Sequence, residues 1–182
     1  YNEELYRNWR DARSDWDTEA RKDIDFYLGN HFTADESDEL AQRNQADIPM
    51  DRISGAIEKF KAVLTARQPA FTITPREDSD VQVSSLWRTV MGYIWQISDG
   101  DWQMKQAIQD YATTGMGYLY VYVDSASDFG RGDVKFTYID PFRVYASPSS
   151  RDRWFSDSDG VILSTILTGD EVINLYRELD DK

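Results

Sequence analysis

Residues 112–124 read Ala-Thr-Thr-Gly-Met-Gly-Tyr-Leu-Tyr-Val-Tyr-Val-Asp, and the spacing of the apolar residues changes within this stretch. Before Gly115 the apolar residues recur every three or four positions, which is typical of a helix packed on one side. From Tyr118 to Asp124 they follow the two-residue period of a strand. Two glycines one residue apart supply the backbone freedom of a helix-to-strand turn. The stretch therefore predicts a junction between a helical half and a β half.

The residues after this junction predict a small antiparallel sheet. A second strand is expected at Val134–Ile139, and the Gly- and Ser-rich residues 125–132 predict a hairpin loop that joins it to the first. The remaining predicted elements are, in order, a short strand at Phe142–Tyr145, an irregular segment over 147–159, a strand at Val161–Leu167 and a final helix capped by Thr168 or Asp170.

The residues before the junction predict four amphipathic helices, because apolar residues recur there at steps of three or four. These are a long helix with its stripe from Leu5 to Tyr27 and a C-cap at Gly29, a second over Met50–Arg67, a third over Asp78–Ser98, and a fourth with Asp101 as its N-cap that ends near Thr114.

Two non-helical segments separate these helices. Residues 31–47 are polar and acidic and predict a loop, with a short helix around Glu39–Arg43. Asp47 or Asp51 is placed to start the next helix, and Pro69 stops it. Ala70–Thr74 alternates in polarity before Pro75 and predicts a short strand.

Together these elements predict an α+β fold, with long amphipathic helices followed by a small antiparallel sheet and a C-terminal helix. We expect a mainly helical part over residues 1–114 and a sheet part with the final helix over 115–182, within one continuous domain. The chain starts at Tyr1, and both of its ends read as helix-like sequence. We therefore expect it to be a portion of a larger protein.

The composition limits the classes of function. The net charge of −13 argues against tight, sequence-specific DNA binding, because a protein that grips phosphates needs a basic face. The sequence has no cysteine, so it can form neither a disulfide nor a thiolate metal site. The apolar runs are shorter than the roughly 20 residues that span a bilayer, which predicts no membrane contact.

The motifs of catalysis and cofactor binding do not match. His31 is the single histidine, so a two-histidine metal site is excluded, and no phosphate-binding loop occurs. Gly115-Met116-Gly117 has Tyr120 where a dinucleotide fingerprint needs its third glycine. We therefore predict no catalytic residue, no metal site and no cofactor.

The first predicted strand of the hairpin carries tyrosines at alternate positions, a pattern that also occurs in platforms for single-stranded bases. Tyr118, Tyr120 and Tyr122 share one face by the two-residue period. Stacking platforms for single-stranded bases normally carry interleaved Arg or Lys, and this strand has neither. Packing of this face against a helix or a neighbouring subunit is the prediction.

Four phrases, in this order, resemble the portal proteins of tailed bacteriophages (the head-to-tail connectors). They are Phe26-Tyr27-Leu28-Gly29 at the end of the first helix, Arg67-Gln68-Pro69 at the exit of the second, Gly115-Met116-Gly117 at the turn, and Ile139-Asp140-Pro141-Phe142-Arg143-Val144 after the hairpin. The resemblance singles out structural motif residues: Phe26, Tyr27, Gly29, Arg67, Pro69, Gly115, Gly117, Ile139, Pro141 and Val144. Many portals continue with Asp-Pro where this chain has Ser147-Pro148, so a role of that Asp does not carry over.

The resemblance implies the N-terminal wing region of a portal. Portals are homo-oligomeric rings, usually dodecamers, at one vertex of the capsid in the virion, and they assemble in the host cytoplasm. Double-stranded DNA passes non-specifically through the ring in packaging and ejection. The implied partners are further copies of the chain, the terminase, the capsid protein and the tail adaptor proteins. The ATPase belongs to the terminase, so the portal itself would be a structural protein and not an enzyme.

Two other functions remain open from the residues alone. One is a different phage structural module, such as an adaptor or a scaffold-binding domain, with the same α+β pattern. The other is an acidic metal-dependent hydrolase that uses the cluster from Asp35 to Glu39, or Asp157 with Asp159. Calcium-loop spacing fails around Asp157, because Phe155 and Ile166 stand at the first and twelfth ligand positions.

Overall fold

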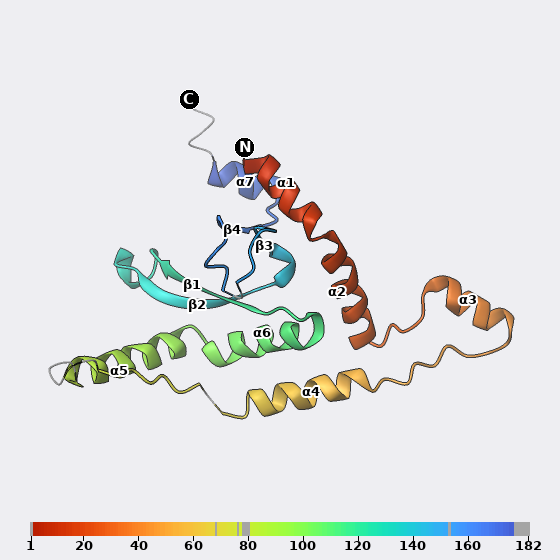
Figure 1. The fold of residues 1–182 in the computed structure, drawn as a ribbon, viewed down its shortest axis with the longest axis horizontal. Coiled ribbons are helices and arrows are strands. Elements are labelled where there is room, and N and C mark those ends of the chain that lie inside the picture. The colour runs from red at the N-terminus through yellow and green to blue at the C-terminus, as the bar shows by residue number, and fades with distance from the viewer. Residues whose placement is uncertain (1, 68, 76, 78–80, 153, 177–182) are drawn as a thin grey trace. The chain divides into compact units, whose positions relative to one another are not determined.

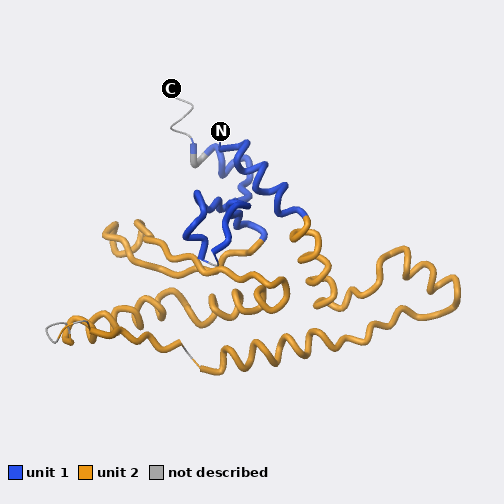
Figure 2. Tube along the Cα trace, viewed as in Figure 1, with its two compact units in different colours: residues 1–14, 142–182 blue, residues 15–141 orange. Residues whose placement is uncertain are grey.

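The computed structural model describes residues 2–67, 69–75, 77, 81–152 and 154–176. The chain forms two compact units, one of residues 1–14 with 142–182 and one of residues 15–141 (Figure 2). The fold is α+β, as predicted, with helices, two separate two-stranded antiparallel sheets and a C-terminal helix (Figure 1). Its elements are α1 (Asn2–Ala12), α2 (Ser14–Tyr27), α3 (Ala34–Gln42), α4 (Ile53–Leu64), α5 (Val81–Ile97), α6 (Gly100–Thr114), β1 (Tyr118–Asp124), η2 (Asp128–Gly130), β2 (Asp133–Ile139), η3 (Pro141–Arg143), β3 (Val144–Ala146), β4 (Val161–Leu163) and α7 (Gly169–Leu175).

The predicted hairpin is confirmed: β1 spans Tyr118–Asp124, and β2 pairs with it in antiparallel register. Val121 lies opposite Phe136, and the Phe136 ring lies 5.7 Å from the Trp95 ring of α5. Directly opposed residues share a face, so the valine face of β1 is the one turned toward the helices. Tyr120 and Tyr122 lie on the other face, where their rings stack at 5.7 Å. Packing of the tyrosine face against a neighbouring subunit stays a prediction.

The outer edge of β2 is closed by side chains from the corner between α5 and α6. The Phe136 N–H donates to Ser98 Oγ at 3.0 Å, and the Tyr138 N–H donates to Gln103 Oε1 at 2.7 Å. These two amides point away from β1, and an open strand edge would pair with another chain. The corner therefore fixes the hairpin on α6 and protects one of its edges.

The corner itself differs from the prediction. Asp101 was expected to cap the fourth helix, but α6 begins at Gly100 with Asp99 at the N-cap in a left-handed conformation (φ 51°). The Asp101 carboxylate instead accepts a hydrogen bond from Trp95 Nε1 at 3.0 Å. A Cβ on Gly100 would lie 2.3 Å from the Trp95 ring, so the tight corner needs a glycine there.

Around α4, two predictions are wrong. The helix is shorter than Met50–Arg67, although the Asp51 carboxylate accepts from the Ile53 and Ser54 N–H groups at 3.0 Å, as expected of a helix start. Ala70–Thr74 forms no strand, and no described segment pairs with it. Phe71 packs instead on the Trp95 ring at 5.6 Å. The alternation of this segment therefore reflects the packing of one ring and not a ladder.

The predicted long first helix is broken. α1 ends at Ala12 and α2 begins at Ser14, and the Arg13 N–H bonds the Arg10 carbonyl, three residues back. The end of α2 follows the prediction, since Gly29 has φ 87° and the Asn30 N–H reaches the Asp25 carbonyl at 2.9 Å. This is the Schellman arrangement of a glycine C-cap.

The acidic segment is more helical than predicted. α3 covers Ala34–Gln42 in place of a loop with a short helix near Glu39. Thr33 accepts from the Glu36 N–H at 3.3 Å, and the Glu36 carboxylate accepts from the Thr33 N–H at 2.8 Å. This capping box starts the helix at Ala34, directly before the acidic run Asp35–Glu39.

The unit of residues 1–14 with 142–182 has its own small core. Trp9 and Tyr145 are buried, and the Tyr6 ring meets the Tyr145 ring edge-on at 5.0 Å. The Arg13 guanidinium lies 4.0 Å from the centre of the Tyr145 ring and donates to the carbonyls of Phe142 and Val144. Arg13 therefore joins α1 to the entry of β3.

The strands of this unit are shorter than expected. The predicted strand at Phe142–Tyr145 is a 3₁₀ turn followed by β3 at Val144–Ala146, and the strand over Val161–Leu167 ends at Leu163. Thr168, and not Asp170, caps α7, because its side chain accepts from the Glu171 N–H. The capping box at Thr168 again marks the start of a helix.

Candidate functional site

The motif residues at the end of α2 link that helix to α4. The Phe26 ring stacks on the His31 ring at 5.2 Å, and His31 Nε2 lies 3.1 Å from the Phe26 carbonyl oxygen. The Tyr27 hydroxyl donates to the Glu58 carboxylate at 2.8 Å. Gly29 then turns the chain away from the helix. The aromatic pair thus has two roles, since Phe26 closes the local turn and Tyr27 makes the long-range contact.

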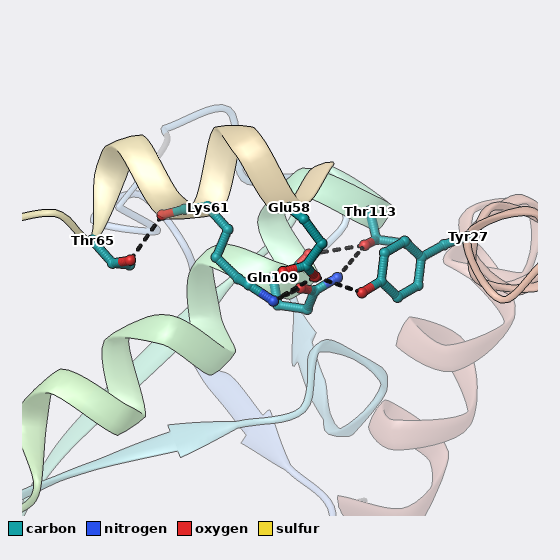
Figure 3. A network of polar contacts seen from close by, with 6 residues as sticks. All are labelled: Tyr27, Glu58, Lys61, Thr65, Gln109 and Thr113. Atoms are coloured by element: carbon teal, nitrogen blue, oxygen red, sulfur yellow. Dashed lines mark hydrogen bonds and ion pairs between the residues drawn. The ribbon is translucent and has the colours of Figure 1, made fainter. Parts of the chain in front are cut away.

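Beyond Tyr27, a polar network continues into α6 (Figure 3). Lys61 Nζ donates to Glu58 Oε1 at 2.6 Å and to Gln109 Oε1 at 2.8 Å, and Gln109 Nε2 reaches Thr113 Oγ1 at 3.3 Å. The hydrogen bond from Lys61, with a smaller one from Tyr27, lowers the pKa of Glu58. The same Glu58 contact raises the pKa of Tyr27. Glu58 therefore joins α4 to α2, and Lys61 joins α4 to α6.

Arg67 and Pro69 lie at the exit of α4, beside a hollow of about 320 Å³. Leu64 and Met104 supply apolar wall, and Asp101 and Lys105 line the hollow as well. Pro69 also borders a second hollow next to Phe71 and Trp95. The Arg-x-Pro phrase therefore shapes a concave surface between α4 and α6.

Gly115 and Gly117 serve the turn for different reasons. Gly115 has φ 80° and caps α6, and its N–H bonds the Tyr111 carbonyl at 3.0 Å. A Cβ on Gly117 would lie 2.1 Å from the carbonyl oxygen of Ala107. The first glycine supplies a left-handed backbone, and the second allows β1 to begin against the side of α6.

The last phrase spans the boundary between the two compact units. Ile139 pairs with Tyr118 at the end of the hairpin, and Pro141 is fully buried at the start of η3. Val144 belongs to the other unit, where it is 5% exposed and its carbonyl accepts from Arg13. The motif residues therefore lie at or near the ends of helices and strands, with Arg67 and Pro69 in the segment that follows α4.

Helix α6 connects most of these ends, through residues that sequence reasoning did not single out. Gln109 receives the α4 contact, and Asp110 accepts a hydrogen bond from the Tyr138 hydroxyl of β2. Burial is the main cause that raises the pKa of Asp110, and Asp140 adds to it. Burial and the bond to Asp110 raise the pKa of Tyr138. Gln109 and Asp110 stand together between the apolar residues Ile108 and Tyr111. This pair of polar residues was the sequence signal for a polar contact of the helix.

Three of the acidic candidates for metal chemistry, Glu36, Glu39 and Asp157, are engaged in local hydrogen bonds. In α3, Glu36 bonds Thr33 and Glu39 pairs with Arg43 at 3.2 Å. Asp157 accepts from the Ser150 hydroxyl at 2.7 Å and from backbone N–H groups of its own loop. Within the residues that the structure describes, no three His, Asp or Glu side chains gather closely enough to hold a metal ion.

None of the described helices is both long enough and apolar enough to cross a bilayer.

The motif residues thus lie at turns, at element ends and in the segment after α4 of an α+β fold. The family model of the phage P22-like portal proteins matches residues 3–182. The chain therefore belongs to the phage P22-like portal protein family, and the family resemblance predicted from the sequence is confirmed. A comparison with curated proteins gave no match.

Proposed function

We propose that the chain is a wing portion of the subunit of a homo-oligomeric portal ring, usually a dodecamer, at one capsid vertex of the virion. The ring is a conduit for double-stranded DNA in packaging and ejection and a platform for head–tail joining. The observation that carries the proposal is the family match over residues 3–182. The neighbours of the ring are the capsid protein, the terminase and the tail adaptors, and assembly takes place in the host cytoplasm.

Exposed apolar surface supports the ring. In α4 the side chains of Phe60 and Val63 are 43% and 75% exposed, and in α5 those of Leu86 and Trp87 are 63% and 54% exposed. Apolar side chains gathered on a surface mark contacts with other molecules. Ring subunits meet head to tail, so each copy needs two different surfaces of this kind.

The charge supports a conduit that does not hold DNA. At a net charge of −13 the chain repels phosphates, and DNA can pass without being bound. Under this proposal the chain has no catalytic residue, no cofactor and no metal. The motif residues Phe26, Tyr27, Gly29, Arg67, Pro69, Gly115, Gly117, Ile139, Pro141 and Val144 are structural: they hold the wing in one shape.

Micrographs and mass measurement of the protein encoded by the whole gene test the proposal. Closed rings with about twelve subunits are expected under assembly conditions. Capsids assembled without the protein should stay empty of DNA. A strictly monomeric protein under the same conditions would contradict a portal ring and favour a monomeric adaptor or scaffold-binding module.

A further inference from the structure

The tip of the β1–β2 hairpin carries a fully exposed aromatic side chain. Phe129 is 106% exposed relative to a free residue, and it adopts φ 54°, next to Asp128 at φ 48°. Bulky side chains adopt the left-handed region at a cost, and such residues gather at functional sites. Within its own subunit this Phe gains nothing from burial that would offset the cost. The geometry suits a side chain that is buried in something else.

The base of this tip is held in place. Lys135 Nζ donates to the Asp124 carboxylate at 2.6 Å and to Ser127 Oγ at 2.8 Å, and the Ser127 hydroxyl donates to Asp124 at 2.6 Å. Asp128, by contrast, has its described ion pair with Arg131 only at 4.0 Å. The tip therefore presents an aromatic ring and a weakly paired carboxylate on a preorganised base.

The hollow between α4 and α6 has the complementary properties. Leu64, Met104 and Ile108 supply apolar wall, and about 320 Å³ is enough for one aromatic ring. Thr65 and Asp101 line the hollow too, and the Asp101 carboxylate accepts a hydrogen bond from Trp95 Nε1. Arg67 and Lys105 line it as well, and among the described residues neither has an ion pair. In a chain of net charge −13, a hollow lined by two cations that form no ion pair with a described residue, and by one carboxylate, is a local exception.

The tip and the hollow lie on different sides of the same unit. Both belong to residues 15–141, where the hairpin packs on one side of α6 and α4 packs on another (Figure 1). A subunit therefore does not fill its own hollow with its own tip. A head-to-tail ring joins two different surfaces of successive copies, and this pair meets that requirement.

We propose that Phe129 of one subunit inserts into the hollow between α4 and α6 of the next subunit, with Asp128 facing Arg67 and Lys105. The proposal rests on the proposed ring and names one of its contacts. Exposed aromatic side chains that enter a partner's pocket are the usual anchors of an interface. The carboxylate adds specificity, because a wrong register would leave the two cations unpaired.

Disulfide trapping tests the contact, and the natural sequence lacks cysteine. The variants are Phe129→Cys at the tip and Ala66→Cys, an exposed small residue that lines the hollow. Oxidised rings that mix the two single variants should give cross-linked dimers, and rings of the double variant should give a ladder of higher species. Each single variant alone should give neither. Ala112→Cys, which lines a different hollow on α6, is the matched control and should not cross-link to Phe129→Cys.

A charge exchange tests the role of Asp128. Lys105→Glu should raise the protein concentration needed for half-assembly by about tenfold, and Lys105→Glu with Asp128→Lys should restore it. Asp170→Lys, an exposed change of the same charge in α7, should not restore assembly of Lys105→Glu. Phe129→Ala should weaken assembly at least as much as Lys105→Glu, whereas Trp154→Ala, an 80% exposed aromatic residue outside the tip, should not.

The outcomes separate this contact from the ring itself. Wild-type protein that never forms rings would refute the proposed function. Rings that form normally with Phe129→Ala and show no Phe129–Ala66 cross-link would overturn this contact and leave the ring intact. Normal rings of Phe129→Ala that fail to join another virion protein would likewise overturn it, because the occupant of the hollow would then not be a second copy.

Discussion

The hairpin with α6 and the helix α4 carry similar apolar content but bury it differently. Trp95 of α5 and Ala107 of α6 are buried where these helices meet the hairpin, and Trp95 packs on Phe136 of β2. In α4 no residue is buried, and Phe60 and Val63 stay largely open. Both segments belong to the same compact unit, so the difference is not one of sequence distance.

The difference teaches how to separate stability from assembly in this protein. The hairpin region pairs β1 with β2, and its edge amides at Phe136 and Tyr138 bond side chains of the α5–α6 corner, so we expect it to be the more stable part of the unit. α4 is connected to it chiefly through the polar network around Glu58 and through partly open apolar contacts. Substitutions in the first region should therefore unfold the chain, and substitutions on α4 should change what it binds.

The largest effect is expected for Trp95→Ala. Trp95 is 9% exposed and contacts Phe71, Phe136 and Asp101. Its loss should lower the free energy of unfolding by about 4 kcal/mol in urea titrations followed by circular dichroism. Phe60→Ala in α4 is the control and should cost about 1 kcal/mol or less. Equal losses would contradict the distinction between the two segments.

The next effect is expected at the turn into β1. Gly117→Ala places a Cβ 2.1 Å from a backbone carbonyl, and the resulting overlap should cost about 3 kcal/mol. Gly115→Ala meets no atom within 4 Å and should cost only about 1–2 kcal/mol, because its φ of 80° is strained for alanine. The same unfolding titration measures both variants. A larger loss for Gly115→Ala would show that backbone strain, and not close packing, governs the turn.

A smaller effect is expected where α2 meets α4. Tyr27→Phe removes one hydrogen bond to Glu58 and leaves the Lys61 bond in place, so it should cost about 1 kcal/mol. Hydrogen exchange should speed up in α4 and not in the hairpin. Unchanged exchange in α4 would mean that the apolar contacts alone hold this helix.

The smallest effect concerns pH. The pKa of Asp110 is raised in the folded state, mainly by burial and further by Asp140, so the folded state binds its proton more tightly than the unfolded state. Asp110 therefore weakens the fold as pH rises through its folded pKa, and this cost is absent below its unfolded pKa. Asp110→Asn should remove this contribution from the stability measured between pH 4 and 7. An identical pH slope in both proteins would contradict it.

Local patterns predicted much of this chain correctly. The period change at Gly115 gave the end of α6 and the bounds of β1 without error, and the glycine at position 29 marked a true C-cap. These features depend on residues within one turn of each other. The capping box at Thr33 was equally local, and reading Glu36 as its partner would have predicted α3.

The errors arose where distant residues decide the conformation. Phe71 alternates with polar neighbours as in a strand, but the Trp95 ring, and not a second strand, buries it. Arg13 lies within the span of the predicted first helix, yet its side chain bonds the carbonyls of Phe142 and Val144, and α1 ends just before it. The residue pattern within one segment does not indicate which distant residues its side chains will contact. The same applies to Gln109 and Asp110, which bond Lys61 of α4 and Tyr138 of β2.

The sequence by itself determined the α+β class, the helix-to-strand junction and the portal family, because period, glycine placement and ordered phrases are properties of the chain. Only the tertiary structure decided which glycine packs and which one turns, and how Arg67 and Lys105 come to line one hollow between α4 and α6. The physical reason is that spacing is read along the chain, whereas burial and charge pairing depend on which residues the fold brings together.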